Sequence, residues 1–190
     1  MAGTDRRIAD EIYDATPGEY RIPVVSVVGK SDSGKTGVLE RLVRELVARG
    51  YRVATVKHHV HEVDVDIPGK DSWRHAKAGS SVTMISSPTQ FVVAGAVDRE
   101  RTLAEIVEAA GDVDILVTEG FLRAGSTRIE VSRRARSEDP ILEPSARFAL
   151  VTDNPDLPAG DRPVFGLDDG TGLADLIERE ILNGRTRNGD

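Results

Sequence analysis

The chain has 190 residues with a formal net charge of −7, no cysteine, and aromatic side chains at only 4% of positions. This acidic, aromatic-poor composition argues against a general nucleic-acid binder, which normally presents a basic surface. The lack of cysteine excludes disulfide bonds, thiolate metal sites and cysteine nucleophiles. The length suits one α/β domain with a sizeable core.

The N-terminal segment and the lengths of the apolar runs indicate the cellular location of the protein. No apolar run approaches the length of a membrane span, and residues 1–20 are charged, without the apolar core of a signal peptide. We therefore expect a soluble, cytoplasmic protein with neither membrane nor nucleic acid as a partner. Residues 1–21 are expected to be an extension, residues 22–183 the domain and residues 184–190 a flexible tail.

The first strong pattern combines a strand, a loop and a helix. Residues 22–28 are nearly all apolar, as in buried parallel strands, and residues 38–47 carry apolar side chains at i, i+3, i+4 spacing before Gly50 ends the helix. The segment between them fits G-x-x-x-x-G-K-[ST] without a mismatch: Gly29-Lys30-Ser31-Asp32-Ser33-Gly34-Lys35-Thr36. This context predicts a phosphate-binding loop.

The chemistry of such a loop assigns roles to its residues. Gly29 and Gly34 allow a tight turn whose amides point at a β-phosphate on the positive end of the following helix. Lys35 would reach the β- and γ-phosphates, and the Thr36 hydroxyl would ligate Mg²⁺. The predicted nucleotide-binding set runs from Gly29 to Gly37.

A second strand at residues 52–57 completes a β-α-β unit and is followed by an unusual segment at residues 58–79. We expect this segment to overhang the nucleotide, because loops beyond the carboxyl ends of parallel strands form the binding crevice. Further patterns predict the rest of the domain. They comprise strands at 82–86, 91–94, 114–118, 127–131, 148–152 and 164–167, and helices at 103–110 and 173–181.

Three carboxylates are candidates for the metal. Glu119 follows a predicted strand and precedes a glycine, which favours the second acidic element of a phosphate-loop site over a solvated strand end. Asp64 and Asp66 alternate with apolar residues, so both project from one face of an extended segment. They either join the magnesium shell, with Asp66 ranked first, or form a solvated edge.

The histidines and arginines leave alternatives open. His58, His59 and His61 lack a second ligand cluster at structural-zinc spacing, so contacts to a phosphorylated ligand or a partner are favoured over a metal site. A local excess of arginine is either a solvated face or an anion-binding surface. It comprises Arg123, Arg128, Arg133, Arg134 and Arg136.

Two carboxylates after a late strand are candidates for recognising the base. Asp153 or Asp156 could accept hydrogen bonds from guanine N1–H and its exocyclic amine. The segment is not the Asn-Lys-x-Asp guanine signature, so the residues alone leave the base open.

Taken together, the motifs resemble the molybdopterin-guanine dinucleotide biosynthesis protein B family of P-loop GTP-binding proteins. Gly37 departs from that pattern, which usually has a second threonine there, and Val60 interrupts a histidine-rich stretch. The resemblance rests on four blocks between residues 22 and 121: the phosphate loop; Val56-Lys57-His58 with His61; Asp66-Ile67-Pro68-Gly69-Lys70-Asp71-Ser72 with Arg74-His75 and Ala78-Gly79; and Val117-Thr118-Glu119-Gly120-Phe121.

This resemblance implies a three-layer P-loop NTPase fold with a mostly parallel central sheet. It implies a homodimeric GTP-binding adaptor with weak Mg²⁺-dependent GTPase activity. The adaptor would assist protein A of the pathway, the molybdenum cofactor guanylyltransferase, in attaching GMP to molybdopterin.

The same resemblance places residues by matching position. Gly34, Lys35 and Thr36 would hold the phosphates and Mg²⁺, with Glu119 as the acidic partner, and Lys35 and Glu119 would act in catalysis. Asp66, Lys70 and Asp71 would lie over the nucleotide or at the partner interface, and arginines after Phe121 would contact the anionic molybdopterin cofactor.

Two other functions use the same loop. A small-molecule kinase would need an acceptor hydroxyl, a base and an arginine-rich lid, for which residues 123–136 are the candidate, but it has no need of the Pro-Gly-Lys-Asp-Ser block. A metal-delivery GTPase is suggested by the histidines and weakened by the missing cysteines.

Overall fold

The structure, a computed structural model, describes residues 20–59, 66–122, 127–136 and 139–182. The chain forms two compact units, unit 1 from residues 1–58 and 102–190 and unit 2 from residues 59–101. Several predictions fall outside the described residues: those on Asp64, His61, Arg123, residues 1–19 and the tail from residue 184.

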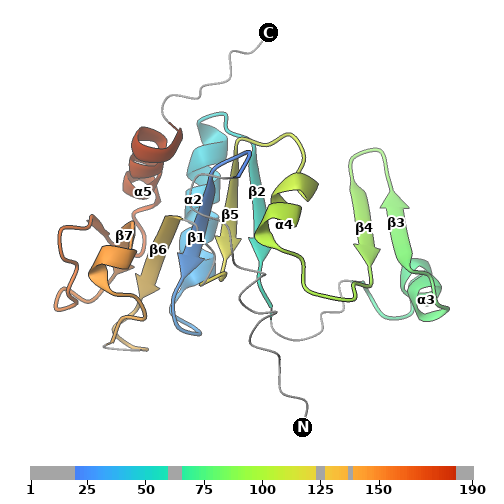
Figure 1. Cartoon of the computed structure of the whole chain (residues 1–190), viewed down its shortest axis with the longest axis horizontal. Helices are drawn as coiled ribbons and strands as arrows, with labels where there is room; N and C mark the ends of the chain where they lie inside the picture. Colours follow the sequence, from blue (N-terminus) through green and yellow to red (C-terminus); the bar gives the residue numbers. More distant parts are fainter. Residues whose placement is uncertain (1–19, 60–65, 123–126, 137–138, 183–190) are drawn as a thin grey trace. The chain divides into compact units, whose positions relative to one another are not determined.

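Unit 1 is built on a six-stranded sheet in the order β2-β5-β1-β6-β7-β8, and every neighbouring pair is parallel (Figure 1). The central strand β1 is buried along its whole length, which explains its unbroken valine-rich sequence. The strands are β1 (Val24–Val28), β2 (Val53–Lys57), β5 (Ile115–Glu119), β6 (Thr127–Ser132), β7 (Ala149–Thr152) and β8 (Val164–Phe165).

Helices cover both faces of this sheet. Successive residues of a strand point to opposite faces, and Val24 and Val25 accordingly belong to two different apolar clusters. The larger cluster packs the sheet against α2 (Lys35–Ala48) and α5 (Gly170–Ile177). The smaller one packs it against α4 (Leu103–Ala109), whose start is closed by a capping box between Thr102 and Glu105. The result is a three-layer α/β architecture, as predicted.

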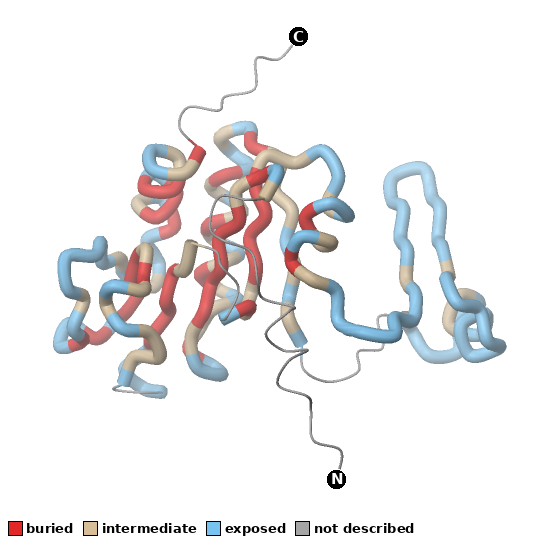
Figure 2. The backbone as a smooth tube through the Cα atoms, in the orientation of Figure 1, coloured by how far each residue is buried: buried red, intermediate tan, exposed pale blue. Residues whose placement is uncertain are grey.

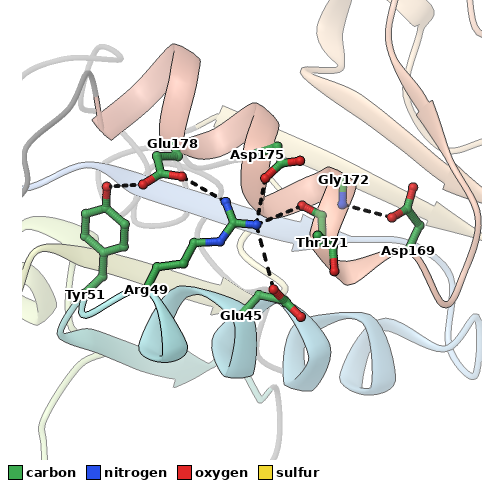
Figure 3. A network of polar contacts seen from close by, with 8 residues as sticks. All are labelled: Glu45, Arg49, Tyr51, Asp169, Thr171, Gly172, Asp175 and Glu178. Carbon is green, nitrogen blue, oxygen red and sulfur yellow. Dashed lines mark hydrogen bonds and ion pairs between the residues drawn. The ribbon is translucent and has the colours of Figure 1, made fainter.

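A polar network fastens the far end of α2 to the last helices of the chain (Figure 3). Arg49 ends α2 and forms ion pairs with Asp175 at 2.7 Å and Glu178 at 2.9 Å. The Tyr51 hydroxyl donates to the other oxygen of Glu178 at 2.8 Å. Burial, followed by the contact with Glu178, raises the pKa of Tyr51 to about 12. This network holds α2, and thus the loop that precedes it, against α5.

Unit 2 contains α3 (Asp71–Lys77) and an antiparallel hairpin of β3 (Val82–Ser86) and β4 (Phe91–Gly95). None of its described residues is buried, as the pale colouring of the hairpin shows (Figure 2). Even so, large apolar side chains occupy the hairpin. The most exposed of them share one face of it: Val82, Met84, Phe91 and Val93.

The predicted strands and helices are all present, with bounds that shift by a few residues. The last helix begins earlier than predicted, at Gly170, because the Asp169 side chain accepts the Gly172 amide at 2.9 Å and caps its start. It continues as a π-helix, η2 (Glu178–Leu182), and a 3₁₀ turn, η1 (Pro144–Ala146), precedes β7. In the described parts of the chain no helix has the length and apolar character needed to span a bilayer.

Candidate nucleotide-binding site

The predicted phosphate loop joins β1 to α2, and two glycines determine its path. Gly29 has a φ of 152°, and a Cβ there would lie 2.3 Å from the carbonyl oxygen of Val131 on β6. Gly34 has a φ of 94° and occupies the N-cap of α2 in the left-handed region, where glycine is strongly favoured. The loop thus turns tightly while lying directly against the neighbouring strand.

The start of α2 is suited to an anion. Gly34 has no side chain to cap the helix, so the first-turn amides have no side-chain acceptor. They lie at the positive end of a 14-residue helix. Lys35 stands beside them, and its ammonium donates to the carbonyl oxygens of Gly29 at 3.1 Å and Lys30 at 2.7 Å. Burial lowers the pKa of Lys35, Glu119 opposes that change, and the charge of Lys57 adds to it.

The predicted magnesium ligands of the loop and of β5 meet in the structure. The Thr36 hydroxyl donates to Glu119 Oε2 at 3.0 Å, and the ammonium of Lys57 lies 3.2 Å from Glu119 Oε1. The Glu119 side chain is only 13% exposed. Both oxygens of this carboxylate are therefore engaged.

Strand pairing explains why these residues meet. Glu119 is the last residue of β5 and stands in register with Val27 of β1 on one side and Lys57 of β2 on the other. The chain then turns sharply, since Gly120 and Phe121 have φ values of 97° and 56°. Phe121 is nevertheless buried, and the His58 ring packs against it with centroids 5.0 Å apart. His58 thus has a packing role beside Glu119.

The loop that follows β6 brings arginines to the other side of the phosphate loop. Arg136 forms an ion pair with Asp32 at 2.6 Å, and the Arg133 guanidinium lies 3.9 Å from where a Cβ on Gly34 would stand. A small pocket lies here, lined in part by Lys30, Ser33, Arg133 and Arg136. Ser33 is buried, and within the described structure its hydroxyl has no hydrogen-bond partner. Of the two interpretations of the arginine cluster, this placement favours an anion-binding surface for these two members.

A buried ion pair supports β6 beneath that pocket. Arg147 Nε lies 2.6 Å from Glu130 Oε2, and both side chains are at most 1% exposed. Glu130 also accepts the Ile141 amide at 2.5 Å, while Arg147 donates to the carbonyl oxygens of Leu142 and Pro158. Glu130 stands in register with Val28, the residue before the phosphate loop. The pair fastens the segment between β6 and β7 to the strand against which the loop rests.

The two carboxylates considered for the base differ in their surroundings. Asp153, directly after β7, accepts the backbone amide of Arg134 at 2.7 Å and so ties the ends of β6 and β7 together. Asp156 is exposed and forms only a long ion pair with Arg134, at 3.9 Å. Of the two, Asp156 has more capacity left for a ligand.

Several of the remaining predicted residues belong to unit 2, which is described by itself. Asp66 accepts the amide of Ile67 at 2.7 Å, and Lys70 is the N-cap of α3. The predicted roles of Asp66, Lys70, Asp71 and His59 near the nucleotide stay predictions. No group of three or more histidine, aspartate or glutamate side chains in the described ranges is arranged to hold a metal ion.

Lys57 stood in one of the four family blocks but had no predicted role in this site, and the Glu130–Arg147 pair was not predicted. The contact of Lys57 with Glu119 depends on β5 lying beside β2, although the paired residues of the two strands are 62 positions apart in the chain (119 − 57). A charged residue within the apolar strand Thr127–Ser132 was a signal for a buried ion pair, but its partner could not be named from spacing.

The donor set fits a magnesium–nucleotide complex. Mg²⁺ prefers oxygen ligands and is usually held by one or two carboxylates together with hydroxyls, waters and phosphates, and Thr36 and Glu119 offer such oxygens side by side. The uncapped amides of α2, the Lys35 ammonium and the unpaired Ser33 hydroxyl offer donors for phosphate oxygens.

Comparisons with known proteins relate this chain to one protein family. Residues 24–153 match the family model of MobB, molybdopterin guanine dinucleotide synthesis protein B. The chain is 31% identical over 160 residues to a molybdopterin-guanine dinucleotide biosynthesis adapter protein of Haemophilus influenzae, covering 83% of this chain and 89% of that one. It is 30% identical over 165 residues to one of Escherichia coli, covering 84% and 94%.

Among solved structures, Bacillus subtilis MobB superposes with a TM-score of 0.68 at 25% identity, covering 84% of this chain and 98% of that chain. The fold is thus the P-loop NTPase fold with a parallel central sheet, as the family resemblance implied.

Proposed function

Since this chain belongs to the MobB family of molybdopterin guanine dinucleotide synthesis proteins, we propose that it is a GTP-binding adapter of molybdopterin-guanine dinucleotide biosynthesis. It binds GTP with Mg²⁺, hydrolyses it slowly, and assists the guanylyltransferase that attaches GMP to molybdopterin. The support for the pathway is the name shared by its relatives in H. influenzae and E. coli.

One observation carries the nucleotide part of the proposal. A phosphate loop, a helix start without a side-chain cap, and the pair of Thr36 and Glu119 at 3.0 Å come together at the carboxyl ends of β1 and β5. In open parallel sheets this edge is where ligands bind. The half-buried Lys35 adds to this support, because its ammonium donates to the carbonyl oxygens of Gly29 and Lys30 within the loop and so stands where phosphates would bind.

The residues of the site have separate roles in the proposed GTP hydrolysis. Bound Mg²⁺ supplies charge neutralisation for the phosphates. Lys35 and the loop amides stabilise negative charge that develops as water attacks the γ-phosphate in line. Glu119 and Thr36 would hold the metal, and a carboxylate committed to that role would not serve as a strong base. Slow turnover is the expected result.

Guanine selectivity is proposed to come from the segment after β7. Asp153 serves as a brace, because its carboxylate accepts the Arg134 amide. Asp156 offers an exposed carboxylate for the N1–H and exocyclic amine of guanine, a pair of donors that adenine lacks.

Calorimetric titration with GTP and with ATP, in the presence of Mg²⁺, tests the proposal. We expect GTP to bind more tightly than ATP, and the GTP-loaded protein to associate with the guanylyltransferase added to the same cell. Preference for ATP without association would move the assignment to a small-molecule kinase. Absence of binding by either nucleotide would remove the phosphate-loop function altogether.

We also propose that the protein is a homodimer and that the hairpin of unit 2 is covered by a second copy. A two-stranded hairpin is marginally stable alone, and the described residues of this small unit include none that is buried in a core of its own. One face of the hairpin presents Val82, Met84, Phe91 and Val93, with Phe91 67% exposed. An apolar face of this kind marks a protein interface.

Sedimentation equilibrium measures this directly. We expect a mass of twice the 20.5 kDa of the chain, and a shift toward the monomer when Val93→Glu places a charge on the apolar face. Thr89→Glu, in the turn of the hairpin, is the matched control and should remain dimeric. A wild-type monomer at micromolar concentration would contradict the proposal.

A further inference from the structure

Lys57 is the one cation of β2 that reaches the predicted magnesium ligands. It is the last residue of the strand, directly in register with Glu119 on β5. Side chains of residues paired in this way lie on the same face of a sheet. The ammonium accordingly lies 3.2 Å from Glu119 Oε1, while Thr36 holds Oε2 at 3.0 Å.

The exposure of the two partners differs greatly. The Glu119 side chain is 13% exposed, whereas that of Lys57 is 60% exposed. A carboxylate that is mostly withdrawn from water loses stability unless a charge or hydrogen bonds compensate it. Lys57 compensates Glu119 from the solvent side, and it can leave at little cost because its own ammonium remains hydrated.

We propose that Lys57 is a built-in counter-ion for Glu119. The Lys57 ammonium pairs with the Glu119 carboxylate when no metal is bound, and Mg²⁺ therefore binds at this carboxylate only together with nucleotide phosphates. The inference rests on the proposed Mg²⁺–nucleotide site and adds a residue that controls when the metal enters. Lys57 is thus a positioning residue that acts through Glu119.

The electrostatic reason is a competition between two cations. An ammonium beside the carboxylate repels a divalent ion, and at a few ångströms this repulsion is worth about a factor of ten in affinity even at the dielectric of water. Nucleotide phosphates bring several negative charges, which outweigh one ammonium. The same charge acts on the neighbouring Lys35, whose pKa it lowers.

An alternative role for Lys57 is to hold the Glu119 rotamer. If Lys57 mainly holds the rotamer, replacing it by a neutral residue would weaken metal binding. If Lys57 mainly acts as a counter-ion, the same replacement would strengthen metal binding. We expect the charge to dominate, because Glu119 is already placed by its strand and by the Thr36 hydroxyl. The sign of the change in metal affinity therefore decides between them.

The experiment is a titration of the nucleotide-free protein with Mn²⁺, followed by the electron paramagnetic resonance signal of the free ion. We expect Lys57→Met to bind Mn²⁺ roughly tenfold more tightly than wild type, and Lys57→Arg, which keeps the charge, to stay close to wild type. Lys57→Met combined with Glu119→Gln should lose the gain, because the carboxylate is then absent.

Arg52→Met is the matched control. Arg52 precedes the same strand at its other end, where it pairs with Asp112, and its removal should leave Mn²⁺ affinity unchanged. Thermal unfolding of each variant verifies the fold, and Lys57→Gln provides a second neutral variant. Unchanged, weaker or undetectable Mn²⁺ binding by the neutral variants would overturn the proposal. The Mn²⁺ titrations need no nucleotide, so failure of this proposal can be distinguished from failure of the proposed GTP binding, which the calorimetric titration measures.

Discussion

Replacing Lys35 by methionine is expected to weaken GTP binding by about two orders of magnitude or more. The reason is that charge-assisted hydrogen bonds contribute about 1.5–3 kcal/mol each and Lys35 is positioned for two phosphates. Its ammonium donates to the carbonyl oxygens of Gly29 and Lys30, so it is already positioned at the loop before a nucleotide binds. Calorimetric titration with Mg²⁺–GTP measures the effect.

Arg44→Met is the control for this change, because it removes one positive charge from an exposed position on the same helix. Its affinity for GTP should stay within about twofold of wild type, as expected for a screened surface charge. If Lys35→Met bound GTP as tightly as the Arg44 variant, the assignment of the phosphate loop would be wrong.

Replacing Arg147 by methionine is expected to lower the free energy of unfolding by about 3–5 kcal/mol, the usual cost of leaving one member of a buried ion pair without its partner. Glu130 would remain buried with its charge uncompensated, and the carbonyl oxygens of Leu142 and Pro158 would lose their donor. Denaturant unfolding followed by circular dichroism gives the free energy.

Two further variants make this result specific. Arg179→Met breaks an exposed contact with Glu180 and should cost less than about 1 kcal/mol. Arg147→Met combined with Glu130→Leu should recover part of the loss, because the isolated charge is then gone. A loss below about 1 kcal/mol in the single Arg147 variant would show that the pair does not support the segment between β6 and β7.

The order of strands and helices followed from the sequence because each element carries a local signal. Strand β1 is an unbroken apolar run, and α2 shows one apolar face whose buried members are Val38, Leu42 and Leu46. The hairpin of β3 and β4 was also predictable from two short apolar segments and their turn. That this hairpin forms a sheet of its own was not predictable, because the residue pattern within a strand does not show which other strand pairs with it.

The candidate site divides in the same way. The phosphate loop and Glu119 could be named from the sequence, since a glycine-rich loop between strand and helix and an acidic strand end are local patterns with a chemical reason. The parallel order β2-β5-β1-β6 could not, and it is this order that brings Lys57 to Glu119 and the loop after β6 to Asp32. The pairing of β6 with β7 likewise makes Asp153 a brace for Arg134.

By itself, then, the sequence determined the phosphate loop, the family and the succession of elements, because residue type and spacing along the chain are enough to specify backbone turns and amphipathic faces. Only the tertiary structure decided which charges meet across strands. Contacts such as Lys57–Glu119 and Glu130–Arg147 depend on register between segments that are not neighbours in the chain. Register arises from the packing of the whole sheet against its helices, which no local pattern contains.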